Sequence, residues 1–217
     1  MLTHPILSQL AMHGIKLGLD RMRDFMQTLG EPHQAYPVVH VAGTNGKGST
    51  CAFMDSVLRA SGYRAGLFTS PHLISFRERI SLDGRPANEI EIAEGLTHLK
   101  KLVSEWREVP TFFEITTALA FKLFTEKKMD VAVVEVGLGG RLDSTNAIIP
   151  SVCVITPISL DHQHILGESI SEIAKEKAGI MKEGVPVISA PQHNDAQAIL
   201  DSRAKELGIS VHYIGGS

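Results

Sequence analysis

The sequence contains little cysteine, no excess of basic charge and no long apolar run. Two cysteines in 217 residues predict no disulfide framework, which fits the reducing cytoplasm. A formal net charge of −3, with dispersed Lys and Arg, gives no field that would attract nucleic acid. No apolar run approaches the roughly 18 residues of a membrane span, and no charged and then apolar leader opens the chain. We therefore expect a cytoplasmic protein that binds small molecules, with no nucleic-acid or membrane partner.

The sequence does contain a regular alternation of strand and helix patterns. The expected strands cover 38–42, 65–69, 76–85, 130–136, 152–156, 185–188 and 209–214, and the expected helices cover 19–29, 51–59, 88–107, 111–124, 169–181 and 196–207. Such alternation predicts an open, mostly parallel α/β sheet with helices on both faces. Ligands of such sheets bind at the carboxyl ends of the strands. The glycine-bearing segment 13–18 is either a loop that contacts a ligand or a plain connection.

The strongest local signal is a glycine-rich stretch between the first strand and a helix. It reads Gly43-Thr44-Asn45-Gly46-Lys47-Gly48-Ser49-Thr50. Glycines allow the backbone to approach an anion closely, the helix N-terminus presents free N–H groups, and Lys47 adds a positive charge. A plain turn is the alternative, but this combination after such a strand is hard to explain as a turn. We predict a phosphate cradle of the P-loop NTPase type, which does not by itself distinguish adenine from guanine.

The cradle differs from the usual P-loop pattern, G-x-x-x-x-G-K-[ST], at two positions. Val41 stands at the first glycine, and Gly48 stands where a hydroxyl would bind magnesium. Ser49 and Thr50 follow, but a helix turns each residue by roughly 100° relative to the one before. The magnesium ligand is therefore expected elsewhere, and Ser70, at the end of a strand and before a proline, is a candidate.

Four other charged or polar positions have two readings each. Glu135 lies in a strand of valines, where an ionised carboxylate is costly unless it is paired, so a metal or catalytic role is favoured over a structural one. Glu114, in the first turn of a helix, either stabilises the helix start or binds a ligand. His162 directly follows Asp161, which could orient it as a metal ligand; the alternative is a surface histidine. Lys177 lies among charges typical of a solvated helix face.

Five motifs carry a family resemblance. They are Gly43–Ser49, Thr69–Leu73, Glu135–Asp143, Leu160–His162 and Glu176–Ile180. In this order, over about residues 14–191, they resemble the folylpolyglutamate synthases and dihydrofolate synthases of the Mur ligase superfamily, whose loop has the same shortened form. The resemblance implies an ATP- and magnesium-dependent ligase. ATP phosphorylates the carboxylate of a folate or dihydropteroate, and the amine of L-glutamate displaces phosphate from the acyl phosphate.

The resemblance also implies roles for single residues. The loop from Gly43 to Thr50 binds the ATP phosphates. Magnesium is held by Ser70, Glu135, His162 and Lys177, the lysine as a carbamate. The catalytic set is Lys47, Glu135, His162 and Lys177, and the pterin side of the substrate is contacted by Phe113, Glu114, Leu142 and Asp143.

The resemblance finally implies that residues 1–217 are an incomplete ATP-binding P-loop domain, because family members carry a second domain with glutamate- and nucleotide-binding groups. We then expect a monomeric full-length parent and an inactive isolated chain. Two alternatives remain: another Mur-type amide ligase, acting on a peptidoglycan precursor, and a nucleotide-binding module without catalysis. The sequence does not choose between dihydropteroate and tetrahydrofolate as substrate.

Overall fold

The computed structural model describes residue 16 and residues 18–215, so only residues 16 and 18 of the segment 13–18 are described. Its strands are β1 Val38–Ala42, β2 Ala65–Phe68, β3 Ile80–Leu82, β4 Arg85–Pro86, β5 Val131–Glu135, β6 Val152–Ile155, β7 Val187–Ser189 and β8 Val211–Tyr213. They form one sheet in the order β4-β3-β2-β5-β1-β6-β7-β8. All neighbours pair in parallel except at β3 and β4, which pair antiparallel. The mostly parallel open sheet is confirmed.

The helices follow the predicted alternation. They are α2 Asp20–Thr28, α3 Lys47–Ala60, α4 Glu89–Leu102, α5 Phe112–Glu126, α6 Gln163–Leu166, α7 Ile170–Ala178 and α8 Asn194–Leu207, with 3-10 turns at Pro32–Gln34, Phe76–Arg79 and Ser144–Ala147. Four of the longer ones begin with side chains that accept from the backbone, as at Thr111 of α5. These caps satisfy N–H groups that a helix start leaves free.

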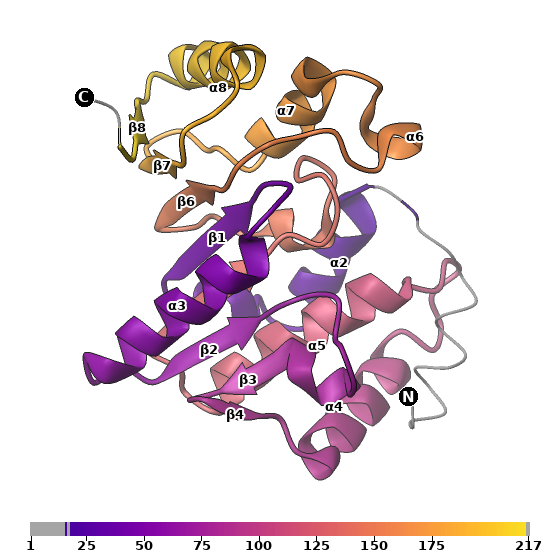
Figure 1. The fold of residues 1–217 in the computed structure, drawn as a ribbon. Helices are drawn as coiled ribbons and strands as arrows, with labels where there is room; N and C mark the ends of the chain where they lie inside the picture. The colour runs from indigo at the N-terminus through magenta and orange to yellow at the C-terminus, as the bar shows by residue number, and fades with distance from the viewer. Residues whose placement is uncertain (1–15, 17, 216–217) are drawn as a thin grey trace.

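The sheet separates two unequal layers, because successive side chains of a strand point to opposite faces. On one face Val41 of β1 packs with Cys51 of α3 and with Val133. On the other face Val38 packs with α2, α4 and α5, while Cys153 packs with α7 and α8. Figure 1 shows α3 in front of the strands and α2 and α5 behind them. Helices on both faces are confirmed, and among the described residues α3 is the helix that packs on the first face.

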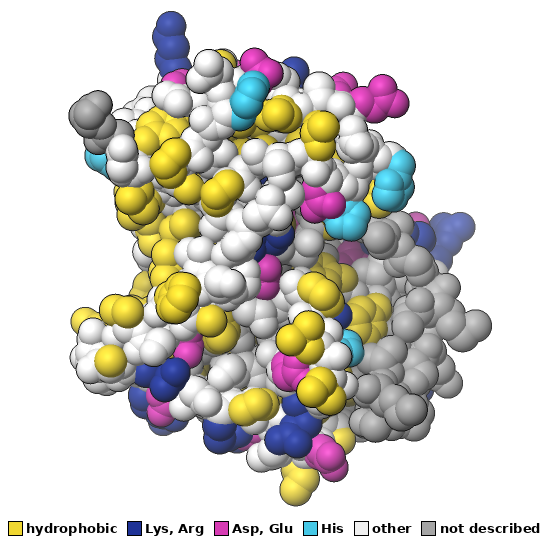
Figure 2. All heavy atoms as spheres, in the orientation of Figure 1, with side chains coloured by type: hydrophobic (Ala, Val, Ile, Leu, Met, Phe, Trp, Pro, Cys, Tyr) yellow, Lys and Arg dark blue, Asp and Glu magenta, His cyan; other side chains and the backbone are white. Residues whose placement is uncertain are grey.

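Hydrophobic side chains reach the surface beside α3. On this helix Phe53 is 73% exposed and Val57 is 65% exposed, and they lie one helical turn apart. Figure 2 shows hydrophobic side chains along the side of the molecule where α3 and the strands β6 to β8 lie. Within the described residues, no helix is long and apolar enough to cross a membrane.

Two predicted elements differ from the structure. The strand expected at 76–85 is a 3-10 turn followed by the short hairpin of β3 and β4. The reason is local, because Glu78 accepts from the backbone N–H groups of Leu73, Ile74 and Ser75, which favours a turn over an extended chain. The helix expected at 88–107 ends at Leu102. Beyond its end, Trp106 packs edge to face on Phe25, with ring centroids 5.5 Å apart.

Candidate active site

The predicted phosphate cradle, Gly43–Thr50, forms a loop and the first turn of α3. This phosphate loop joins β1 to α3 and requires its glycines. Gly43 has φ 145°, and a Cβ at this position would lie 1.9 Å from the hydroxyl oxygen of Thr156. Gly46 has φ 81° and stands directly before the first residue of α3, Lys47. Both conformations favour glycine. The strand, turn and helix predicted for this stretch are confirmed.

The loop is held in place by backbone and side-chain hydrogen bonds to the segment after β6. The N–H groups of Thr44 and Asn45 donate to the carbonyl of Pro157, at 3.0 and 3.2 Å. The Thr44 hydroxyl donates to the carbonyl of Ser159 at 3.0 Å, and the amide of Asn45 donates to the hydroxyl of Ser159 at 2.9 Å. Lys47 Nζ lies over the loop, 3.3 Å from the Thr44 carbonyl. These bonds fix the loop beside the first turn of α3, where the Lys47 ammonium adds a positive charge to that of the helix N-terminus.

Glu135 and Ser70 meet beside this loop, at the carboxyl ends of β5 and β2. The backbone N–H of Ser70 donates to Glu135 Oε2 at 3.0 Å. Glu135 is 4% exposed, and burial raises the pKa of its carboxyl group. A Cβ at Gly48 would lie 3.6 and 3.7 Å from the two carboxylate oxygens. The first turn of α3 thus lies directly over the carboxylate, and a Cβ at Gly48 would be in ordinary van der Waals contact with it.

Lys177 approaches the phosphate loop from α7. Its Nζ donates to the Gly43 carbonyl at 2.8 Å, and the residue is 3% exposed. Burial, together with the charge of Lys47, lowers the pKa of the Lys177 ammonium to about 8, against the attraction of Asp161. The solvated helix face that the sequence pattern favours is therefore wrong for Lys177. This buried amine is deprotonated far more readily than an ordinary lysine.

His162 lies farther out than the other predicted metal ligands. Its side chain is 52% exposed, and its Nε2 is 3.7 Å from Asp161 Oδ1. Its φ of 45° directs the chain into the short helix α6. Asp161 lies beside His162, and its negative charge also attracts the Lys177 ammonium. The metal role that the resemblance implies for His162 stays a prediction.

The four residues predicted for the substrate side lie on two neighbouring segments. The Phe113 ring closes over Gly137, where a Cβ would lie 2.4 Å from its Cζ. Both Glu114 oxygens accept from Arg21 Nε at 2.9 Å, and one also accepts from the N–H of Thr111. Glu114 therefore stabilises the start of α5, as one of its two interpretations from the sequence predicts.

Asp143 is also engaged inside the protein. It is 4% exposed and accepts from the N–H groups of Leu138 and Thr145. Burial raises the pKa of its carboxyl group in spite of these bonds. Leu142, beside it, is half-buried. Substrate contacts by Phe113, Glu114, Leu142 and Asp143 stay predictions.

The residues present fit magnesium. Among the described residues, no three His, Cys, Asp or Glu side chains come together to hold a metal ion. Magnesium does not require such a cage, because it usually keeps several waters and binds one or two carboxylates plus substrate phosphates. Glu135 with the Ser70 hydroxyl beside the phosphate loop supplies that kind of donor set.

Sequence reasoning missed one cation near this site. Arg79 is 8% exposed, lies 5.3 Å from the ring centroid of Phe112, and donates from Nε to His72 Nδ1 at 2.8 Å. Burial lowers the pKa of Arg79, and the Glu135 carboxylate opposes that shift. Arg79 follows the Ser-Pro-His motif at 70–72 within a few residues, which was the available signal. The sequence pattern predicts a strand over 76–85 and therefore does not reveal the turn that returns Arg79 to His72.

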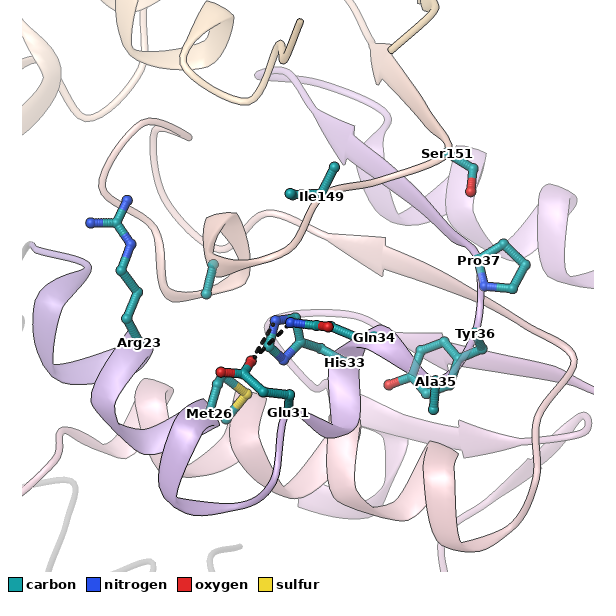
Figure 3. A pocket seen from close by; sticks show the side chains of 11 residues that line it. Arg23, Met26, Glu31, His33, Gln34, Ala35, Tyr36, Pro37, Ile149 and Ser151 are labelled. Carbon is teal, nitrogen blue, oxygen red and sulfur yellow. Dashed lines mark hydrogen bonds and ion pairs between the residues drawn. The ribbon is translucent and has the colours of Figure 1, made fainter. Parts of the chain in front are cut away.

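A separate cavity of about 640 Å³ lies at the other end of the strands. Its lining includes Pro37 and Ser151, which immediately precede β1 and β6. Figure 3 shows His33, Glu31 and Arg23 around it, with Glu31 bonded to His33 and Gln34. Because it opens at the amino ends of the strands, this cavity is not part of the phosphate site.

The comparisons with known proteins agree with this geometry. A family model described as the Mur ligase middle domain matches residues 41–216. The dihydrofolate synthase/folylpolyglutamate synthase of Bacillus subtilis (strain 168) is 47% identical over 197 residues, which are 88% of this chain and 46% of that protein. The apo form of L. casei FPGS superimposes with a TM-score of 0.92 at 36% identity, covering 98% of this chain and 54% of that one.

An FPGS–AMPPCP–folate complex superimposes with a TM-score of 0.90 at 36% identity, again over 98% of this chain and 54% of that one. The chain thus spans about half the length of the relatives it matches. Fold, motifs and sequence identity all lead to the same group. The chain belongs to the Mur ligase family, and within that family it is similar to the folylpolyglutamate and dihydrofolate synthases.

Proposed function

We propose that this chain is the ATP-binding part of a ligase that joins L-glutamate to the carboxylate of a folate or of dihydropteroate. Its similarity to synthases of both kinds supports the reaction, and an FPGS complex with AMPPCP and folate supports the ligands. The reaction uses ATP to form an acyl phosphate, from which the glutamate amine displaces phosphate. We also propose that residues 1–217 are an incomplete domain, so that ligation needs a longer, monomeric protein.

The observation that carries the proposal is the convergence of three groups at one edge of the sheet. The phosphate loop, the Glu135–Ser70 pair and the buried Lys177 amine come from β1, β5 with β2, and α7. Phosphoryl transfer to a carboxylate brings two anions together, so the site must supply positive charge and fixed donors. Lys47 and the free N–H groups of α3 supply them for the ATP phosphates.

The metal ligands are assigned on the same basis. Ser70, Glu135, His162 and Lys177 would hold magnesium, with Lys177 on the buried side and His162 on the exposed side. When bound, magnesium supplies charge neutralisation between ATP and the carboxylate. Lys177 is proposed to act as a carbamate, which forms when its neutral amine adds to carbon dioxide and releases a proton. A pKa of about 8 leaves part of the amine neutral near neutral pH. The new carboxylate would then face the loop in place of the ammonium.

The first experiment measures binding of Mg·ATP to the 217-residue chain by calorimetry. Binding that disappears when magnesium is chelated supports the phosphate site. No binding by folded chain contradicts it. GTP in place of ATP tests the nucleobase, which the loop itself does not specify.

A second experiment measures incorporation of labelled glutamate by the longer protein, with dihydropteroate or tetrahydrofolate as acceptor. Incorporation into one or both identifies the substrate. Incorporation into neither, with Mg·ATP binding intact, leaves a nucleotide-binding module without catalysis, which the half-length match makes the second candidate for the isolated chain. Reaction with a peptidoglycan precursor instead would assign another Mur-type ligase.

A further inference from the structure

Three buried polar side chains form a series behind the phosphate loop. His40 comes from the middle of β1, and its Nε2 lies 2.9 Å from the hydroxyl oxygen of Thr145. That hydroxyl lies 2.6 Å from Asp143 Oδ1. His40 and Thr145 have no exposed surface. A fully buried polar chain of this kind persists only where its members satisfy one another, and it then fixes a single arrangement.

The direction of each hydrogen bond follows from the number of protons available. Asp143 accepts from two backbone N–H groups, at Leu138 and Thr145, so its oxygens act as acceptors. The Thr145 hydroxyl has one proton and, at 2.6 Å, donates it to Asp143. His40 Nε2 must therefore donate to Thr145, which places a proton on Nε2.

The other imidazole nitrogen agrees with this assignment. His40 Nδ1 has no hydrogen-bond partner within the described part of the chain. A proton on that nitrogen would be a buried donor without an acceptor, which is unfavourable. Burial lowers the pKa of His40 to about 3, so the ring stays neutral throughout the working range of pH.

The loop that carries Thr145 also carries the contacts that dock α7. The N–H of Arg141 donates to the Glu176 carbonyl at 2.7 Å, and Asn146 donates to the Gly179 carbonyl at 3.0 Å. Gly140 lies so close to α7 that a Cβ there would be 2.7 Å from the Glu176 carbonyl oxygen. These contacts bracket Lys177 on both sides. Its amine then reaches Gly43, the residue that follows β1.

These contacts connect β1, the loop at 137–147, α7 and the phosphate loop in a ring. β1 holds the loop at 137–147 through His40 and Thr145, this loop holds α7, and α7 returns Lys177 to the phosphate loop at the end of β1. We propose that His40 and Thr145 are positioning residues that set the register between the phosphate loop and Lys177. The proposal rests on the proposed function of the loop as the Mg·ATP site. Neither residue touches the nucleotide, and both act through the loop and α7.

The test uses three variants of the 217-residue chain. Thr145→Val removes the hydroxyl at nearly constant shape, and Thr145→Ser retains it. Thr117→Val is the matched control, because Thr117 is equally buried but its hydroxyl has no hydrogen-bond partner within the described residues. Mg·ATP affinity is measured well below each variant's melting temperature, so that a loss of folded protein does not enter.

Thr145→Val is expected to weaken Mg·ATP binding about tenfold and to speed hydrogen exchange at the Leu138 and Arg141 amides, because coupling through buried networks has this size. Thr145→Ser and Thr117→Val should stay within about twofold of the unaltered chain. Unchanged affinity and exchange in folded Thr145→Val would overturn the proposal.

A second measurement does not depend on nucleotide binding or on a folded variant. Nitrogen-15 NMR of the imidazole in the unaltered chain should show a bonded proton on His40 Nε2 and none on Nδ1. The opposite tautomer, or a charged ring, would overturn the series. If the unaltered chain does not bind Mg·ATP, the proposed function fails, while the imidazole spectrum and the amide exchange still decide whether His40 and Thr145 hold the loop.

Discussion

Two loops follow neighbouring central strands and end at the same edge of the sheet, yet they use their polar groups in opposite ways. The phosphate loop after β1 is tied from outside, through Pro157 and Ser159, and leaves the first turn of α3 open to a ligand. The loop after β5 turns its polar groups inward, where Asp143 accepts from its own backbone. The difference fits the proposed roles, in which the first loop binds phosphate and the second positions the elements around it.

The largest expected effect is on the outward-facing loop. Lys47→Ala should weaken Mg·ATP binding by about 100-fold, since a hydrogen bond to a charged group is worth about 1.5–3 kcal/mol. Its melting temperature should stay within a few degrees, because Lys47 makes a single long contact to its own loop. Lys175→Ala, on the exposed side of α7, is the control for loss of charge. Native ATP affinity in Lys47→Ala would remove the loop's assigned role.

The next effect concerns Lys177 of α7, the helix that the loop at 137–147 holds in place. The pKa of Lys177 falls from 10.5 to about 8 on folding, so the unfolded chain binds this proton more tightly. The cost of burying the ammonium is therefore full below pH 8 and disappears as pH rises from about 8 to 10.5. Over this window the unfolding free energy of the unaltered chain should rise relative to Lys177→Met, by about 2–3 kcal/mol.

Urea melts of both proteins at several values of pH measure this difference. Lys175→Met gives the baseline for an exposed lysine on the same helix. Parallel pH curves for the unaltered chain and Lys177→Met would show that the amine is not buried as the contact with Gly43 indicates.

A substitution in the loop at 137–147 should lower the free energy of unfolding more than it lowers nucleotide affinity. Gly140→Ala places a methyl group 2.7 Å from the Glu176 carbonyl oxygen, and the backbone there cannot easily move. We expect a loss of about 1–3 kcal/mol in unfolding free energy. Gly30→Ala is the control, since its Cβ would meet nothing within 4 Å and only its positive φ is strained. Unchanged unfolding free energy in Gly140→Ala would mean that α7 does not dock as closely as described.

The smallest effect is expected at Glu135, which lies between the two loops. Folding raises the pKa of its carboxyl group above 4.5, so the native state binds this proton more tightly. Stability is then greatest at acid pH and falls as pH rises from 4.5 through the raised value. Glu135→Gln should lack this fall and, without magnesium, gain about 1 kcal/mol at neutral pH. Thermal melts at pH 4 and pH 8 would contradict this if Glu135→Gln were the less stable protein at both.

The sequence predicts most of the fold because its signals are local. The signals of β5, the phosphate loop and α5 are a run of valines, the glycines around Lys47 and a nearly continuous apolar stretch, and each depends on neighbouring residues only. The same reasoning fails at Phe76–Arg79, where one glutamate side chain binds three N–H groups and makes a turn. A pattern of apolar residues does not reveal such a competing hydrogen bond.

The sequence indicates candidate residues for the site but not the contacts that these residues make. Glu135 is recognisable because an ionised carboxylate in a buried strand of valines is costly unless it is paired or binds a metal. The burial of Lys177 is not recognisable, because its surroundings along α7 are charged and only the folded chain brings it to Gly43. The internal engagement of Asp143 is likewise a property of the closed loop rather than of its sequence.

The central place of β1 has a consequence for how the protein folds. β1 pairs with β5 and β6, and the contacts around it join residues 105 and 134 positions apart along the chain. Closing loops this long costs chain entropy before the contacts stabilise the fold, so they slow the approach to the native state. Protection of the chain by Mg·ATP would then report these long-range contacts around the loop rather than a local turn.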